Sequence, residues 1–136
     1  MLVILDSNIL FSSLISPNSP PHRIYQAWRQ GDYELVTCSE QLEEIRRASR
    51  YPKFKHILQP HLVGAMLNNM QKAIFYSNLP SGYEANDPND AWMLALADKS
   101  QSHYLVTGDK KAGVLSLAKI GQTKIVTAST FCNQVL

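Results

Sequence analysis

The order in which short apolar runs and helical patterns follow one another constrains the fold of this chain most. The chain opens with a continuous apolar run at 2–5, which is typical of a strand buried on both faces of a sheet. Strand-like segments recur at 33–38, 104–107 and 124–127, and helical patterns fill the intervals. Strands that alternate with helices predict βαβ units. We therefore expect an α/β fold with a mostly parallel sheet covered on both sides.

The helical segments are predicted from apolar spacing, capping residues and proline. Ser16 to Pro21 is expected to be a loop, because it holds three prolines and small polar residues. Residues 75–79 suit either a helix end or a short strand. Seven helices are expected. The first follows the cap types Ser7 and Asn8, the second includes Ile24 to Trp28 and stops at Gly31, and the third runs from a Ser39 cap to before Pro52. The fourth begins at Pro60, the fifth spans about 88–100, the sixth lies near 111–118, and the seventh starts at Ser129.

Length and composition bound the class of protein. The 136 residues, 45% of them hydrophobic and 18% charged, predict a single folded domain over 1–136. No apolar run approaches the roughly 20 residues that a membrane span requires, and no secretion signal is recognised. Cys38 and Cys132 lack CxxC spacing, so we expect reduced cysteines in a cytoplasmic protein without membrane partners. A net charge of +2 is too small to indicate nucleic-acid binding by itself.

Four acidic residues stand where an α/β fold would bring them together. Asp6 ends the first strand-like run, Glu44 lies in a helix, Asp90 opens another helix, and Asp109 follows the strand at 104–107. Ligands of open parallel sheets bind beyond the carboxyl ends of the strands. Clustered carboxylates repel one another, and a hard divalent cation would hold them together. Oxygen ligands suit Mg²⁺ or Mn²⁺ rather than zinc, so the pattern predicts metal-dependent phosphodiester chemistry.

Each acid also has an ordinary structural explanation. Asp6 and Asp90 are favoured residues at helix starts and could simply cap. Asp87 competes with Asp90, and Asp109 could be a turn residue. Glu44 lies nearer the edge of the apolar stripe than its neighbour Glu43, but periodicity alone does not separate the two securely.

Other common catalytic patterns are missing from the sequence. The four histidines form no HxxxH or HExxH pair, and no GxGxxG, GxxxxGK[ST] or GxSxG motif occurs. These absences argue against zinc hydrolases, the common nucleotide-binding sheets and hydrolase triads.

Four motifs in order carry a resemblance to a known family. They are Asp6-Ser7-Asn8; Ser39 with Glu44-Ile45 and then Pro52-Lys53; Asp87-Pro88-Asn89-Asp90 followed by Leu94-Ala95-Leu96-Ala97; and Val106-Thr107-Gly108-Asp109-Lys110. Over essentially its whole length the chain resembles a PIN domain, of the bacterial group of toxin components related to VapC. The resemblance selects Glu44 over Glu43 and Asp90 over Asp87.

The resemblance implies a three-layer α/β/α sandwich and a Mg²⁺- or Mn²⁺-dependent ribonuclease that acts as the toxin of a toxin–antitoxin pair. Its implied catalytic and metal-binding residues are Asp6, Glu44, Asp90 and Asp109, with Ser7, Asn8 and Thr107 as polar support. Its implied partners are RNA, a cognate antitoxin and, since dimers are common in the family, a second copy of the chain. Members often carry a further acid where Lys111 and Ala112 stand here, which leaves open whether one or two metal ions bind.

RNA binding would need cations around an acidic cleft. The candidates are Arg46, Arg47, Arg50, Lys53 and Lys55 in one run and Lys110 with Lys111 in another, and a solvated helix face explains any one of them equally well. Tyr33, Tyr51 and Trp92 could stack on bases, although core packing suits Trp92 better.

Two rival functions follow from the same features. The first is a catalytically weak PIN scaffold that binds a protein partner or RNA. The second is a phosphoryl-transfer protein of the receiver or haloacid-dehalogenase type, which also places acids at strand ends. Asp6-Ser7-Asn8 lacks the second acid of a D-x-D site, and the receiver pattern is not matched cleanly either.

Overall fold

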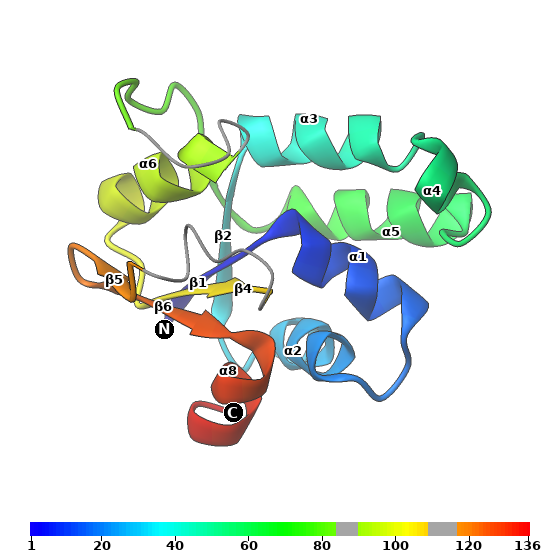
Figure 1. Ribbon diagram of the computed structural model, residues 1–136, viewed down its shortest axis with the longest axis horizontal. Coiled ribbons are helices and arrows are strands. Elements are labelled where there is room, and N and C mark those ends of the chain that lie inside the picture. Colours follow the sequence, from blue (N-terminus) through cyan, green and yellow to red (C-terminus); the bar gives the residue numbers. More distant parts are fainter. Residues whose placement is uncertain (84–89, 109–116) are drawn as a thin grey trace.

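A six-stranded sheet forms the centre of the molecule (Figure 1). The computed structural model describes residues 1–83, 90–108 and 117–136. The strand order is β3-β2-β1-β4-β6-β5, and every neighbouring pair is parallel except β5 with β6. The strands are β1 (Leu2–Leu5), β2 (Glu34–Cys38), β3 (Ile74–Tyr76), β4 (Tyr104–Thr107), β5 (Lys119–Ile120) and β6 (Thr123–Thr127). The predicted mostly parallel sheet is confirmed.

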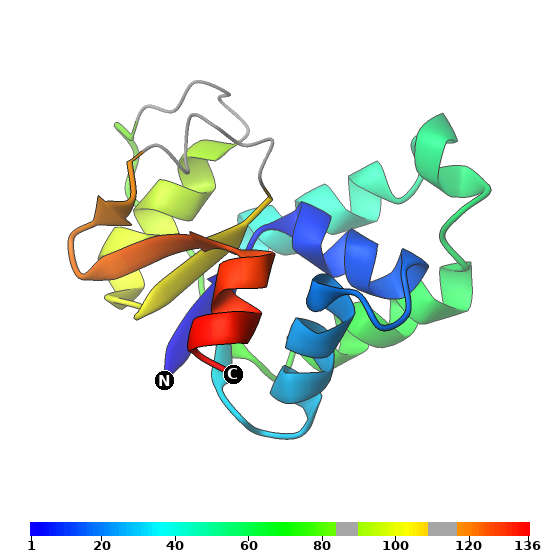
Figure 2. The same ribbon diagram turned by 60° about the horizontal axis from the view of Figure 1, so that its bottom comes forward.

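Helices connect these strands and cover both faces. Those in the described ranges are α1 (Ser7–Ile15), α2 (Pro20–Arg29), α3 (Ser39–Ala48), α4 (Pro52–Lys55), α5 (Pro60–Met70), α6 (Ala91–Ser100) and α8 (Ala128–Gln134). Figure 1 shows α6 on one side of the strands and α1, α2, α3 and α5 on the other. Figure 2 brings α8 forward, where it lies beside α2.

Alternation along the buried strands produces the three layers. Val3 and Leu5 join the core under α1, α2, α3, α5 and α8, whereas Ile4 between them joins the core under α6. Val106 and Leu105 divide in the same way. Successive side chains of a strand point to opposite faces, so an all-apolar strand supplies both cores. This is the α/β/α sandwich that the sequence resemblance implies.

Several element boundaries differ from the sequence-based expectation. Helix α2 starts at Pro20, inside the expected loop, because a proline in the first turn lacks only an N–H that the helix leaves unpaired. The short helix α4 was not anticipated, and Pro52 opens it in the same manner. Residues 74–76 form the edge strand β3, which resolves the ambiguity after α5.

The helix caps also differ. Asp6, not Ser7 or Asn8, is the N-cap of α1, and its carboxylate accepts a hydrogen bond from the Asn8 backbone N–H. Cys38 occupies the N-cap position of α3, and Ser39 is already helical with its hydroxyl bonded to Glu40.

The region after β4 is only partly described. Residues 111–116 of the expected helix near 111–118 lie outside the described ranges. Leu117 and Ala118 are not helical, and the strand β5 begins at Lys119. The start of the expected 88–100 helix also lies partly outside, and its described part is α6.

Within the described ranges, no helix has the length and apolar character needed to cross a membrane.

Candidate active site at the carboxyl edge of the sheet

Asp6 is held rigidly where the two central strands end. It is 3% exposed and directly follows β1. Its backbone N–H donates to the carbonyl of Val106, and one carboxylate oxygen accepts a 2.8 Å hydrogen bond from the Thr107 hydroxyl on β4. Strand order reverses between β1 and β4, so Asp6 lies at the topological switch point where open α/β sheets bind ligands. Asp6 therefore caps α1 and also lies at the edge where sheets of this kind bind ligands.

A buried glutamine ties α3 to the ends of β1 and β2. The Gln41 side-chain amide donates to the Leu5 carbonyl at 2.6 Å, and its oxygen accepts from the Thr37 hydroxyl at 2.7 Å. The same amide lies 3.5 Å from the Ser7 hydroxyl. Sequence reasoning missed Gln41. Its signal was a polar residue on the inner face of α3, one turn before Glu44.

Glu44 faces the same edge from α3. Burial raises the pKa of its carboxyl, and hydrogen bonds from Ser7 and Trp92 counteract that rise. The negative charges of Asp6 and Asp90 raise the pKa further. The indole N–H of Trp92 donates to Glu44 at 3.4 Å, a contact that the sequence did not suggest. Glu43, the competing residue, is exposed to solvent.

Asp90 enters from the opposite side of this edge, at the start of α6. It is 6% exposed and occupies the N-cap position, yet its carboxylate makes no capping hydrogen bond to the first turn of the helix. Capping thus does not explain this buried acid. Asp87, the competing residue, lies outside the described ranges, as do Asp109 and Lys110. Asp109 follows the end of β4 by two positions in the sequence.

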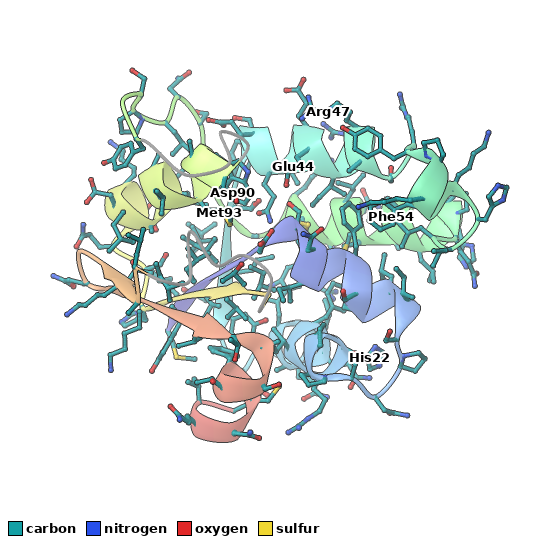
Figure 3. The ribbon with its side chains drawn as sticks, viewed as in Figure 1. His22, Glu44, Arg47, Phe54, Asp90 and Met93 are labelled. Atoms are coloured by element: carbon teal, nitrogen blue, oxygen red, sulfur yellow. The ribbon has the colours of Figure 1, made fainter. Side chains whose placement is uncertain are left out.

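One cavity of about 440 Å³ unites the described acids, and we call it the polar pocket. Figure 3 shows Asp90 toward the start of α3, Glu44 along the middle of this helix, and Phe54 beyond its far end. The pocket is lined by Asp6, Ser7, Asn8, Phe11, Glu44, Arg47, Ala48, Tyr51, Lys53, Phe54 and Asp90. Two of the predicted polar supports, Ser7 and Asn8, are among these residues, while Thr107 reaches the site through Asp6.

The comparisons with known proteins decide the family. A family model described as PIN domain matches residues 2–111, which is most of the chain and includes all four acids of the sequence pattern. The chain belongs to the PIN domain family. PIN domains are generally metal-dependent nucleases. The chain matches no curated protein sequence.

The donor atoms of this PIN domain suit a hard divalent cation, because the polar pocket offers carboxylate oxygens. The mutual repulsion that raises the pKa of Glu44 is also what a bound cation would relieve. However, no three His, Cys, Asp or Glu side chains of residues 1–83, 90–108 and 117–136 are arranged so that they could hold a metal ion on their own. The donor chemistry fits, and the described carboxylates alone do not complete a ligand set.

The basic run of the PIN domain divides between two surfaces. Arg47 and Lys53 line the polar pocket. Arg46, Arg50 and Lys55 instead line a second cavity of about 510 Å³ between α3, α4 and α5. Helical spacing explains part of the division, because Arg47 lies one turn after Glu44 on α3, whereas the neighbouring Arg46 points from another face of the helix. Arg50 follows the end of α3, so its position depends on the turn after the helix.

Two histidines and both cysteines take structural positions. The ring Nδ1 of His22 bonds the Ser13 carbonyl, and that of His103 accepts from the Leu2 backbone N–H. Figure 3 places His22 on α2, away from Glu44 and Asp90. Cys38 and Cys132 are buried free thiols, and neither lines the polar pocket.

Proposed function

We propose that this PIN domain is a Mg²⁺- or Mn²⁺-dependent endoribonuclease and the toxin component of a toxin–antitoxin pair. One observation supports the catalytic part most strongly. Three carboxylates from separate elements, Asp6 after β1, Glu44 on α3 and Asp90 before α6, line one pocket at the switch point of a PIN domain. An acidic pocket of this kind would repel RNA unless a cation reversed its local charge.

The chain's own side chains would position this site. Asp6, Glu44 and Asp90 would hold the ion together with Asp109. Thr107 fixes the orientation of Asp6 by its hydrogen bond, and Trp92 does the same for Glu44.

When bound, the divalent ion supplies an activated water and neutralises charge that develops on the phosphate. The protein supplies the remaining positive charge. Arg47 and Lys53 line the same pocket as the acids, so they would attract and hold the RNA backbone beside them.

The test is cleavage of a labelled RNA by purified protein with added Mg²⁺ or Mn²⁺. We expect endonucleolytic products with either ion, none in excess EDTA, and none from Asp90→Asn purified in parallel. Undiminished cleavage in EDTA would contradict the metal mechanism. Equal cleavage by Asp90→Asn would point to a contaminating nuclease or a different site.

The toxin assignment is supported by the resemblance of the four ordered motifs to those of VapC-related toxin components. Induced expression of the parent chain in a bacterial host should arrest growth, whereas Asp90→Asn should not. Co-expression of a small protein encoded next to the chain should restore growth if that protein is the antitoxin. Normal growth with abundant, folded parent protein would argue against a toxin.

A catalytically weak scaffold is the alternative, and one observation favours it. The described carboxylates by themselves do not complete a metal-ligand set. Titration of the protein with Mn²⁺ separates the two functions. A nuclease should bind the ion saturably and lose that binding in Asp90→Asn, whereas a scaffold should show weak binding that the substitution does not change.

A further inference from the structure

The polar pocket has two chemically different ends. Asp6, Glu44 and Asp90 form its acidic end at the edge of the sheet. Its other end is aromatic and basic, and the residues there come from the last turn of α3, from the N-cap position of α4 and from α4 itself. They are Arg47, Tyr51, Lys53 and Phe54. In Figure 3, Phe54 lies apart from Asp90, with Glu44 and Arg47 between them.

Tyr51 presents an accessible aromatic ring in this pocket. The residue is 45% exposed and lines the cavity. Its backbone is nevertheless anchored. The Tyr51 N–H donates to the Ala48 carbonyl at 3.0 Å, and its carbonyl accepts from the N–H groups of Phe54 and Lys55 at 2.9 and 3.0 Å. The ring thus projects from a fixed point of the fold without being packed into the core.

Phe54 lines the same pocket but packs against other side chains. Its ring lies 4.9 Å from the ring of buried Phe11, and the Lys53 ammonium lies 4.9 Å from its centroid. Phe54 is therefore already in contact with partners and joins the main core. Its contacts support α4 and hold Lys53 at the pocket, which leaves Tyr51 as the aromatic surface open to a ligand.

Two cations line the same pocket as Tyr51. Arg47 and Lys53 are both exposed and both line the pocket. Phosphates contact arginine and lysine, while bases stack on aromatic rings, and proteins that bind single strands combine the two. The acidic end of the pocket therefore suits a reacting phosphate, and the open ring with its two cations suits the next part of the same strand.

We propose that Tyr51 is the residue on which an unpaired base next to the scissile phosphate stacks, with Arg47 and Lys53 on flanking phosphates. A base within a duplex stays stacked on its neighbours and cannot cover the Tyr51 ring. The choice of RNA rests on the proposed ribonuclease function, whereas stacking and phosphate contact are properties of the pocket itself.

The test measures binding separately from cleavage. Fluorescence anisotropy of a short labelled RNA, alone and annealed to its complement, is recorded in EDTA and again with Ca²⁺ in place of Mg²⁺. The parent should bind the single strand more tightly than the duplex. Tyr51→Ala should weaken single-strand binding about 5- to 150-fold, the range that loss of one stacked base produces. Tyr51→Phe, which keeps the ring, should bind like the parent.

Matched controls come from similar residues outside the pocket. Phe75 is 46% exposed on β3, so Phe75→Ala removes an equally exposed ring and should leave binding unchanged. Arg47→Ala or Lys53→Ala should lower the slope of log affinity against log salt by about 0.7 each, as for one lost phosphate contact on a single strand. Arg46→Ala, which changes a residue of the second cavity, should keep that slope, and so should Tyr51→Ala.

Several outcomes overturn this inference. The first is that Tyr51→Ala and the parent bind the single strand with equal affinity. The second is that the parent binds duplex as tightly as single strand, and the third is that the parent does not bind the single strand in either buffer. Its failure is distinguishable from that of the proposed function. Binding that depends on Tyr51 without any cleavage would refute the ribonuclease and keep the stacking site. Metal-dependent cleavage that is unchanged in Tyr51→Ala would keep the ribonuclease and refute the stacking site.

Discussion

Thr107 and Asp6 join the two central strands by a buried hydrogen bond, in which the threonine hydroxyl donates to a carboxylate oxygen at 2.8 Å. Thr107 is fully buried and Asp6 nearly so. A carboxylate that loses its donor in such a place keeps the cost of desolvation without compensation. The hydrogen bond therefore positions an acid of the site and also stabilises the fold.

Thr107→Val should lower the free energy of unfolding by about 1–3 kcal/mol, because it keeps the shape of the side chain but removes the donor to Asp6. Thr107→Ser retains the hydroxyl and should lose less of the hydrogen-bond contribution. Urea denaturation of the three proteins in EDTA measures both changes. Equal stability of the parent and the valine variant would show that this hydrogen bond contributes nothing.

Glu44→Gln should reduce RNA cleavage by about 100-fold or more, since loss of even an outer-shell partner of a metal costs up to that factor. Glu43→Gln removes a carboxylate from the exposed face of the same helix and should retain activity. Initial rates at saturating Mn²⁺ compare the two variants. The assignment of Glu44 is wrong if Glu43→Gln proves the more damaging change.

Glu44 should also make the stability of the metal-free protein depend on pH. Its pKa is raised from the ordinary 4.5, so near and above that value the folded state holds a proton that the unfolded state has released. Stability then falls as pH rises through the interval between the unfolded and folded pKa values, and the penalty is complete above the folded one.

Glu44→Gln removes this penalty. In EDTA it should be more stable than the parent at neutral pH and lose that advantage below pH 4.5. Thermal melts of both proteins across this range provide the measurement, with Glu43→Gln as the control for an exposed carboxylate. An advantage that grew toward acid pH would contradict the sign of the shift.

Asp90→Asn should reduce the stabilisation of the folded protein by added metal. A ligand that binds only the folded state adds about 2.7 kcal/mol of stability at a hundredfold excess over its dissociation constant. Mn²⁺ should therefore raise the melting temperature of the parent and raise that of Asp90→Asn much less. Without metal the variant should be at least as stable, because one of the mutually repelling charges is gone. Equal shifts in both proteins would mean that Asp90 is not a ligand.

The two thiols should be inert in the folded protein. Burial raises the pKa of Cys38 to about 12 and also raises that of Cys132, so little reactive thiolate forms at neutral pH. Mass spectrometry after a short iodoacetamide treatment should find both cysteines unmodified in native protein and both alkylated in denaturant. Fast native labelling at Cys38 would contradict its burial.

The sequence by itself determined the elements whose signals are local. The apolar run of β1 and the Asp6 that follows it can be recognised from a few consecutive residues, and so can the β4 segment that ends at Thr107. Strands alternating with helices then lead to the parallel sheet, because short connections leave few topologies. The acids Asp6 and Asp90 were recognisable for the same reason, since each stands at a boundary of such an element.

Only the tertiary structure decided which distant groups meet at the site. Gln41 bonds the Leu5 carbonyl across 36 positions of sequence, and Trp92 reaches Glu44 across 48. Helical spacing could have separated Arg47 from Arg46, but the direction of Lys53 depends on how the chain turns between α3 and α4. Local periodicity specifies the faces of one element, whereas packing against the rest of the fold specifies what each face contacts.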